Sequence, residues 1–236
     1  MRIVATLASA IAASMFLSAQ VFADPAPQPT DGDPRPAIVQ LFMDPQCNQT
    51  PVGDGTGFVT AVQPLQDGLN LITIYTAHHV TRDMPCLDIR WYGDQMGNPS
   101  KLDPHKMQLV HTKAIHFSVY SNDVFSFQVV SNHVPEALVM GSTLPAFAAP
   151  ISAVGFPGAS EWFLVTGNIA GDANTINIGY NDYPAIPVTT TSGFYPGLSG
   201  SPVFDASGDV FAIADACDVG PDGINHGYVV LLPGVN

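Results

Sequence analysis

Residues 197–204 read GLSGSPVF, and residues 76–80, well upstream, read TAHHV. The first stretch places Ser199 in a tight turn between Gly197 and Gly200, and the second places a histidine pair directly after a hydrophobic run. A serine hydroxyl is a poor nucleophile near neutral pH unless a neighbouring base takes its proton as it attacks. The two stretches therefore predict a serine nucleophile and its general base.

A third stretch lies between these two. Residues 122–127 read NDVFSF, so Asp123 opens an apolar strand after a polar turn. The three motifs and their order resemble those of the chymotrypsin-like (trypsin-fold) serine peptidases, with the bacterial trypsin-like and glutamyl-endopeptidase-like branch as the nearer match. The resemblance implies an all-β fold of two six-stranded antiparallel barrels, with the active site in the cleft between them.

The resemblance also implies a role for each motif residue. Ser199 is the expected nucleophile, His79 the general base, and Asp123 the carboxylate that orients the imidazole and stabilises its cation. The amides of Gly197 and Ser199 are the expected oxyanion hole. The mechanism that this implies is peptide hydrolysis through an acyl-enzyme, with no cofactor and no metal.

Three residues are alternatives to these assignments, and His78 is a further histidine next to the expected base. His78 is expected to point away from His79, because successive side chains of a strand alternate. Asp88 and Asp103 also lie between base and nucleophile and could replace Asp123, while Ser201 could replace Ser199.

The specificity pocket is expected between residues 192–196 and 214–217, with Gly193, Asp215 and His226 as candidate pocket residues. Asp215 would favour basic substrate side chains and His226 acidic ones, and the sequence does not choose between them. Leu198 precedes the nucleophile, where activated zymogens of this family usually carry an aspartate that pairs with a new N-terminus. We therefore expect an active form that needs no such insertion.

The chain contains three cysteines. A disulfide between Cys47 and Cys86 would link the loops around His79, and the oxidising environment of an exported protein would allow this bond to form. Cys217 is then expected to be a buried or partly buried thiol.

The domain organisation is predicted from composition. Residues 1–23 have the pattern of a secretory signal and residues 24–36 form a Pro-rich tail. The N-terminal barrel is expected over residues 37–132, a connector over 133–144, and the C-terminal barrel over 145–236. We expect a secreted or periplasmic protein with no membrane anchor after signal cleavage.

Short runs of β-type residues separated by turn signals define the expected strands. Gly53-Asp54-Gly55 and Gln66-Asp67-Gly68 are two of these turn signals. The runs of the first barrel are residues 37–43, 57–62, 70–76, 86–92, 107–115 and 124–130. Those of the second are residues 151–155, 162–168, 175–178, 185–191, 202–204 together with 210–214, and 227–232.

The net charge is −13, from seven Lys and Arg against 20 Asp and Glu. This charge argues against a nucleic acid or an anionic membrane as partner, because no cationic run is present. The expected partner is a protein or peptide substrate, and the expected state is a monomer. A trypsin-fold protein that binds ligands without catalysis is the alternative, since a fold can outlast its chemistry.

Overall fold

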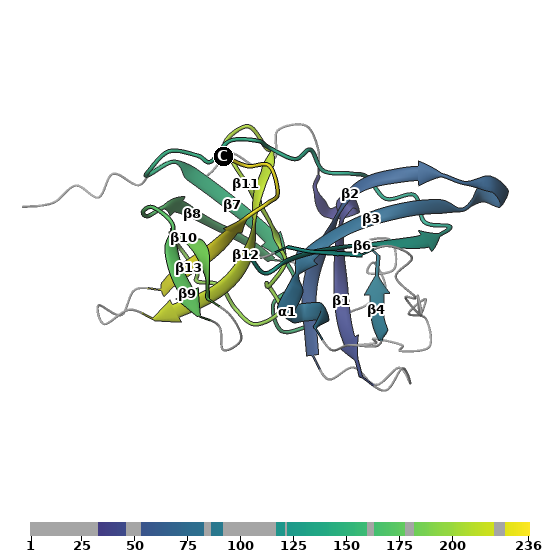
Figure 1. Cartoon of the computed structure of the whole chain (residues 1–236), viewed down its shortest axis with the longest axis horizontal. Helices are drawn as coiled ribbons and strands as arrows, with labels where there is room; N and C mark the ends of the chain where they lie inside the picture. Colours follow the sequence, from purple (N-terminus) through teal and green to yellow (C-terminus); the bar gives the residue numbers. More distant parts are fainter. Residues whose placement is uncertain are drawn as a thin grey trace, which may run out of the picture.

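Antiparallel strands make up nearly all the regular structure of the chain, in two sheets that lie side by side (Figure 1). The computed structural model describes residues 33–45, 53–82, 86–91, 117–120, 122–159, 163–177, 182–219 and 225–236.

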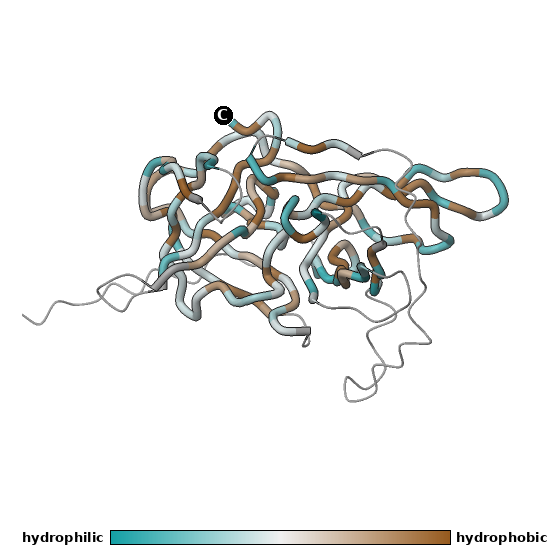
Figure 2. The backbone as a smooth tube through the Cα atoms, turned by 60° about the horizontal axis from the view of Figure 1, so that its bottom comes forward, coloured by the Kyte–Doolittle hydropathy of each residue, from teal (hydrophilic) through white to brown (hydrophobic). Residues whose placement is uncertain are grey.

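The N-terminal sheet has the order β4-β1-β2-β3-β6-β5. Alternation of apolar residues explains its core strands: along β3, Asn70, Ile72, Ile74 and Thr76 are buried while the residues between them are partly exposed. The β2–β3 hairpin turns through the 3-10 segment η2 (Gln66–Gly68), and its outer end is hydrophilic (Figure 2). The strands are β1 (Ile38–Asp44), β2 (Gly53–Pro64), β3 (Asn70–Ala77), β4 (Cys86–Arg90), β5 (Phe117–Val119) and β6 (Val124–Ser131).

The C-terminal sheet has the order β13-β12-β11-β7-β8-β10-β9. An additional pairing of β13 with β10 closes six of these strands into a barrel, which leaves β9 as an extension of β10. Closure removes the free sheet edges. The strands are β7 (Pro150–Gly155), β8 (Phe163–Ile169), β9 (Asn174–Asn177), β10 (Asp182–Thr190), β11 (Pro202–Phe204), β12 (Val210–Val219) and β13 (Asn225–Leu231).

The predicted fold class is confirmed, with several local differences. Residues 202–204 and 210–214, counted as one strand, form the antiparallel pair β11 and β12 around a turn, which gives the second sheet seven strands. Gly53-Asp54-Gly55 is not a turn: these residues begin β2 and pair with β1, because glycine fits an extended strand as well as a turn. Strand β5 was not predicted, and the expected strand at 107–115 lies outside the described residues.

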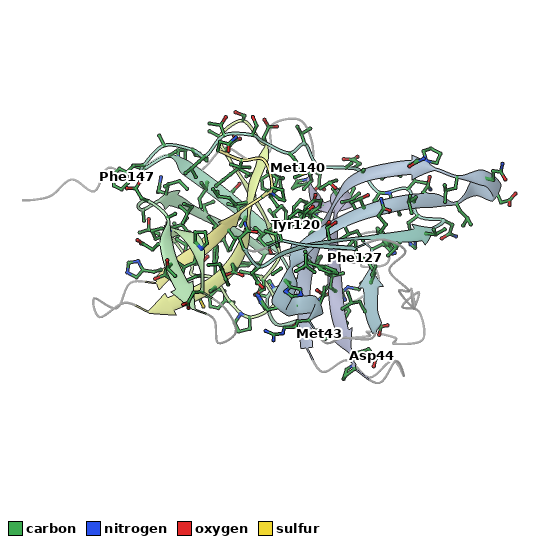
Figure 3. All side chains as sticks on the ribbon, viewed as in Figure 1. Met43, Asp44, Tyr120, Phe127, Met140 and Phe147 are labelled. Atoms are coloured by element: carbon green, nitrogen blue, oxygen red, sulfur yellow. The ribbon has the colours of Figure 1, made fainter. Side chains whose placement is uncertain are left out.

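One hydrophobic core runs through both sheets. Phe127 lies inside the N-terminal sheet and is almost fully buried, whereas Phe147 points outward at the far end of the C-terminal barrel (Figure 3). Residues 132–149 connect β6 to β7 as irregular chain, apart from a single bridge between Met140 and Val210. The two sheets therefore share one core, which holds residues from distant parts of the sequence in fixed relation.

Helical structure is confined to short segments in the described chain. Beside η2, these are η1 (Arg35–Ala37), η6 (Pro157–Ala159) and the single turn α1 (His78–Thr81). The last residues of the expected tail thus form a 3-10 turn against β1 and β2 rather than extended chain. None of the described helices has the length and apolar character to cross a membrane.

The cysteine predictions have mixed outcomes. Cys217 lies exposed on β12, so the expected buried or partly buried position was wrong. Its place in the lining of a solvent-accessible pocket explains the exposure. Cys47 lies outside the described residues, and the disulfide with Cys86 stays a prediction.

Candidate active site

The nucleophile turn is shaped by two glycines in the left-handed region. Gly197 has φ of 95° and Gly200 has φ of 86°, values that side chains with a Cβ rarely adopt. Within the turn, the amide of Leu198 donates to the carbonyl of Tyr195, and the amide of Ser201 donates to that of Leu198. These bonds hold Ser199 between β10 and β11 at the edge of the C-terminal barrel.

Thr56 of β2 fixes this turn to the N-terminal sheet. Its amide donates to the carbonyl of Ser199 at 2.9 Å, and its hydroxyl donates to the carbonyl of Gly197 at 2.8 Å. The amide of Phe156 donates to the same hydroxyl at 3.0 Å. Sequence reasoning missed Thr56, although a threonine between two glycines directly before the apolar run of β2 is a signal that could have drawn attention to it.

The histidine pair lies on α1, immediately after β3. The amide of His78 donates to the carbonyl of Asp123 at 2.6 Å, which fixes the start of the helical turn beside the carboxylate. The ring of His78 stacks on Phe125 with centroids 5.8 Å apart, while His79 enters the site. The two side chains do diverge, but helical turning rather than strand alternation separates them, so the predicted reason was wrong.

Asp123 holds the His79 ring from the turn before β6. Its backbone lies in the left-handed region, with φ of 61°. Its Oδ2 lies 2.6 Å from His79 Nδ1, the distance of a strong charge-assisted hydrogen bond in which Nδ1–H donates. The neighbouring Asn122 donates its Nδ2–H to the carbonyl of Leu231 at 2.6 Å, which ties this turn to β13.

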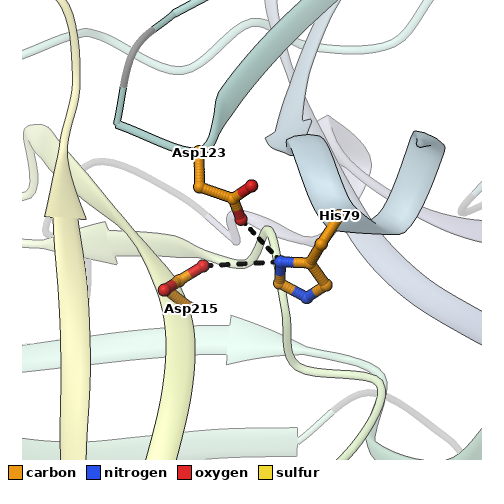
Figure 4. Close-up of side chains that lie close together, drawn as sticks. All are labelled: His79, Asp123 and Asp215. Carbon is orange, nitrogen blue, oxygen red and sulfur yellow. Dashed lines mark hydrogen bonds and ion pairs between the residues drawn. The ribbon is translucent and has the colours of Figure 1, made fainter. Parts of the chain in front are cut away.

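A second carboxylate faces the same ring nitrogen (Figure 4). Asp215 of β12 places Oδ1 at 3.5 Å from His79 Nδ1, and its Oδ2 accepts a 2.5 Å hydrogen bond from the Tyr183 hydroxyl of β10. Among the described residues, Oδ1 has no hydrogen-bond partner, although the side chain is completely buried. Sequence reasoning placed Asp215 in the specificity pocket; the residue does line the pocket next to Ser199, and its carboxylate also faces His79.

These charges shift the proton affinities of the site. Burial alone would lower the pKa of His79, but the hydrogen bond and charge of Asp123, together with the charge of Asp215, raise that pKa above its ordinary value. Burial raises the pKa of Asp215 to about 7, helped by the charge of Asp123 and opposed by the Tyr183 hydrogen bond and by His79. Burial next to Asp215 also raises the pKa of Tyr183. The charges of His79 and Asp215 thus influence each other's proton affinity.

The same three residues could in principle bind a metal ion, since His79, Asp123 and Asp215 offer ligand atoms within 4.8 Å of one another. The 2.6 Å between His79 Nδ1 and Asp123 Oδ2 fits a shared proton. Two ligands of a tetrahedral zinc ion, each about 2.0 to 2.2 Å from it, would lie farther apart than that. The arrangement is therefore suited to proton transfer.

The Ser199 hydroxyl lies beside this cluster. Its Oγ donates to the backbone carbonyl of Asp215 at 3.1 Å. The turn also packs on the strand that leads to His79: a Cβ added at Gly200 would come within 2.8 Å of the Ala77 amide nitrogen. In the described chain, the amides of Leu198 and Gly200 donate to carbonyls, whereas those of Gly197 and Ser199 donate to no backbone carbonyl.

A pocket of about 270 Å³ opens next to Ser199. Both predicted wall segments contribute to it, and its lining is largely apolar; the side chain of Asp215, its acidic residue, is completely buried. Gly193 is buried beside Phe194, and His226 lies on β13 opposite Thr189; neither belongs to the lining. The lining residues are Phe194, Tyr195, Pro196, Leu198, Ser199, Ala214, Asp215, Ala216 and Cys217.

The remaining alternatives occupy other places. Ser201 is fully buried, and a Cβ at Gly155 would collide with its Oγ, so no substrate reaches this hydroxyl. Asp88 is buried on β4 opposite Phe42 and is not in the group around His79, while Asp103 lies outside the described residues. Leu198 is almost fully buried in the core, an environment that suits no ammonium ion.

A closed barrel and a second antiparallel sheet that hold a serine turn beside a histidine and a carboxylate define a serine endopeptidase. The comparison of family models agrees: residues 55–213 match the family described as "Trypsin-like peptidase domain". The chain belongs to this family of trypsin-like peptidases. The comparison with curated proteins gave no match.

Solved structures resemble the chain in fold. The active form of the Rv3671c protease from M. tuberculosis is 18% identical with a TM-score of 0.57, and the match covers 84% of this chain and 77% of that one. The HtrA-type protease AlgW with a tripeptide is 17% identical with a TM-score of 0.56, covering 84% and 56%. The MamO protease domain from Magnetospirillum magneticum is 14% identical with a TM-score of 0.55, covering 84% and 93%.

Proposed function

We propose that this protein hydrolyses peptide bonds through an acyl-enzyme formed on Ser199, with His79 as general base and Asp123 as its orienting carboxylate. The observation that carries the proposal is the 2.6 Å contact between His79 Nδ1 and Asp123 Oδ2, with the Ser199 turn held beside it. Because Nδ1–H donates to Asp123, the other ring nitrogen, Nε2, is free of its proton and can act as the base.

The reaction proceeds in two stages. Ser199 Oγ attacks the substrate carbonyl carbon while Nε2 of His79 takes the hydroxyl proton; the peptide C–N bond then breaks, and His79 gives that proton to the leaving amine. Water attacks the resulting ester in the same manner and releases the acid. The amides of Gly197 and Ser199 are the proposed donors to the oxyanion, supported by their lack of carbonyl partners in the described chain.

A fluorophosphonate probe, which reacts with activated serines, tests the proposal. We expect labelling of the wild type and of Ser201→Ala, a matched control that removes a buried hydroxyl from the same turn. Ser199→Ala should not be labelled. A folded wild-type protein that resists the probe would contradict the catalytic proposal and favour the trypsin-fold binding protein.

The proposal includes export to the periplasm or the medium. The composition of residues 1–23, an apolar Ala-rich stretch that follows Arg2 and ends at Ala23, supports it. We expect the mature protein to begin near Asp24. Expression of the full-length chain in a bacterium, followed by fractionation and N-terminal mass analysis, tests this, and an uncleaved protein that stays in the cytoplasm would contradict it.

A further inference from the structure

We propose that Asp215 is a positioning residue of the catalytic cluster, whose buried carboxyl orients the His79–Asp123 pair and sets the pH at which His79 becomes a base. The inference rests on the proposed function, in which His79 is the general base. It assigns to Asp215 a role other than the choice of substrate side chains.

Three contacts fix the position of Asp215 beside His79 and Ser199. Its Oδ1 lies 3.5 Å from His79 Nδ1, its Oδ2 accepts the Tyr183 hydroxyl at 2.5 Å, and its backbone carbonyl accepts the Ser199 hydroxyl at 3.1 Å. One residue of β12 therefore touches both the base and the nucleophile. Figure 4 shows the two carboxylates of Asp123 and Asp215 converging on the same nitrogen from different elements.

Within the described part of the chain, no lysine or arginine is among the groups that act on the charge of Asp215. The titratable groups that face it are His79 from α1, Asp123 from the turn before β6, and Tyr183 from β10. Two buried carboxylates this close cannot both be ionised cheaply, so one proton is retained between them or passes to the histidine. The unpartnered Oδ1 is the atom that can hold this proton and donate it toward Asp123.

The direction of the effect follows from these charges. An ionised Asp215 favours the imidazolium form of His79, which cannot act as a base, and therefore raises the pKa of His79. A neutral Asp215 does not raise the pKa of His79 in this way. Tyr183 favours the ionised form of Asp215 by its hydrogen bond, and loss of that bond should make Asp215 more protonated. Removal of either group should thus shift the His79 titration toward lower pH.

The test is an NMR titration of the His79 ring in the wild type, Asp215→Asn and Tyr183→Phe, together with the pH dependence of kcat/KM. Asparagine keeps the size of the side chain and an acceptor for Tyr183, but cannot ionise. An opposite charge at this distance commonly shifts a pKa by about 1 to 3 units, and partial protonation of Asp215 reduces its share. We expect the midpoint in Asp215→Asn to fall by about one pH unit. The acid limb of kcat/KM should move with it.

Tyr183→Phe should show a smaller shift in the same direction, and it decides the question alone if Asp215→Asn does not fold. Asp172→Asn, which removes an exposed carboxylate from the β8–β9 turn, should leave the midpoint unchanged. A His79 midpoint that stays at its wild-type value in both site variants overturns the inference, even where the probe still labels Ser199. Failure of the probe to label the wild type, with the midpoint shifting as expected, would instead refute the proposed function and leave the electrostatic role of Asp215 intact.

Discussion

Asp123 accepts the Nδ1–H of His79 at 2.6 Å and thereby selects the tautomer in which Nε2 can take a proton. An amide in its place would reverse this selection, because an Asn Nδ2–H would donate to Nδ1 and leave the proton on Nε2. The chemistry of this single residue therefore depends on charge and acceptor capacity rather than on shape.

We expect Asp123→Asn to lower kcat by about four orders of magnitude near neutral pH, with little change in the free energy of unfolding. Steady-state hydrolysis of a peptide library and urea unfolding measure the two effects. An active Asp123→Asn enzyme would mean that Asp215 serves as the orienting carboxylate in its place.

Asp215 carries a stability cost that depends on pH. Its folded pKa of about 7 lies above the ordinary value of 3.8, so the folded state binds an extra proton between these pH values. The free energy of unfolding therefore falls as pH rises toward 7, and above that the folded state must hold a buried charge.

We expect Asp215→Asn to raise the free energy of unfolding at pH 8 by about 1 to 3 kcal/mol, because the buried charge is removed. The gain should shrink near pH 4, where the wild-type carboxyl is neutral. Urea unfolding at both pH values measures it, and a variant that is less stable than the wild type at pH 8 would contradict the account.

The nucleophile turn is the element on which the two barrels meet. Gly200 has φ of 86°, and a Cβ there would lie 2.2 Å from the carbonyl oxygen of Thr56 and 2.3 Å from Thr76 Oγ1. Gly68, with φ of 72° in the β2–β3 turn, has no atom within 4 Å of such a Cβ. A comparison of alanine substitutions at Gly68 and Gly200 therefore distinguishes the cost of backbone strain from the cost of a steric clash between the nucleophile turn and the N-terminal sheet.

We expect Gly68→Ala to cost about 1 kcal/mol in the free energy of unfolding, from strain alone, and Gly200→Ala to cost about 3 kcal/mol or more. Denaturant unfolding of both variants checks the difference. Equal costs would show that the turn does not press against β2 and β3 as described.

At the scale of the element, local sequence patterns predicted the positions of the strands. They did not predict which contacts the strands make with their neighbours. Runs of β-type residues predicted β3 and β6 within a residue at most of each boundary, and the Gln66-Asp67-Gly68 signal predicted the turn between β2 and β3. The glycines at 53 and 55 led to the wrong prediction of a turn, because pairing with β1 holds their backbone extended. Thr56 and the orientation of Asp215 depend on contacts across the barrels, which no local pattern contains.

The whole molecule presents substrate with an apolar pocket. Its lining includes Phe194, Leu198 and Ala214. Asp215 is the acidic residue of this lining, and its side chain is buried and faces His79. A charged side chain placed there would lose its hydration without gaining an ion pair.

We expect peptides with alanine, valine or leucine before the cleaved bond to have kcat/KM values at least about tenfold higher than those with lysine or glutamate, which corresponds to about 1.4 kcal/mol. Competitive hydrolysis of a peptide library with mass-spectrometric readout measures the preference. A preference for lysine would indicate that Asp215 determines specificity, and a preference for glutamate would indicate that His226 does.

The central claim is that Ser199 becomes covalently attached to the acyl half of its substrate. Intact-mass analysis after mixing the enzyme with an activated ester, quenched in acid within the first turnovers, tests it directly. The account predicts one added acyl group, located on the peptide that contains Ser199 and absent from His79→Ala. An unmodified Ser199 during active hydrolysis, or an acyl group on another residue, would contradict it.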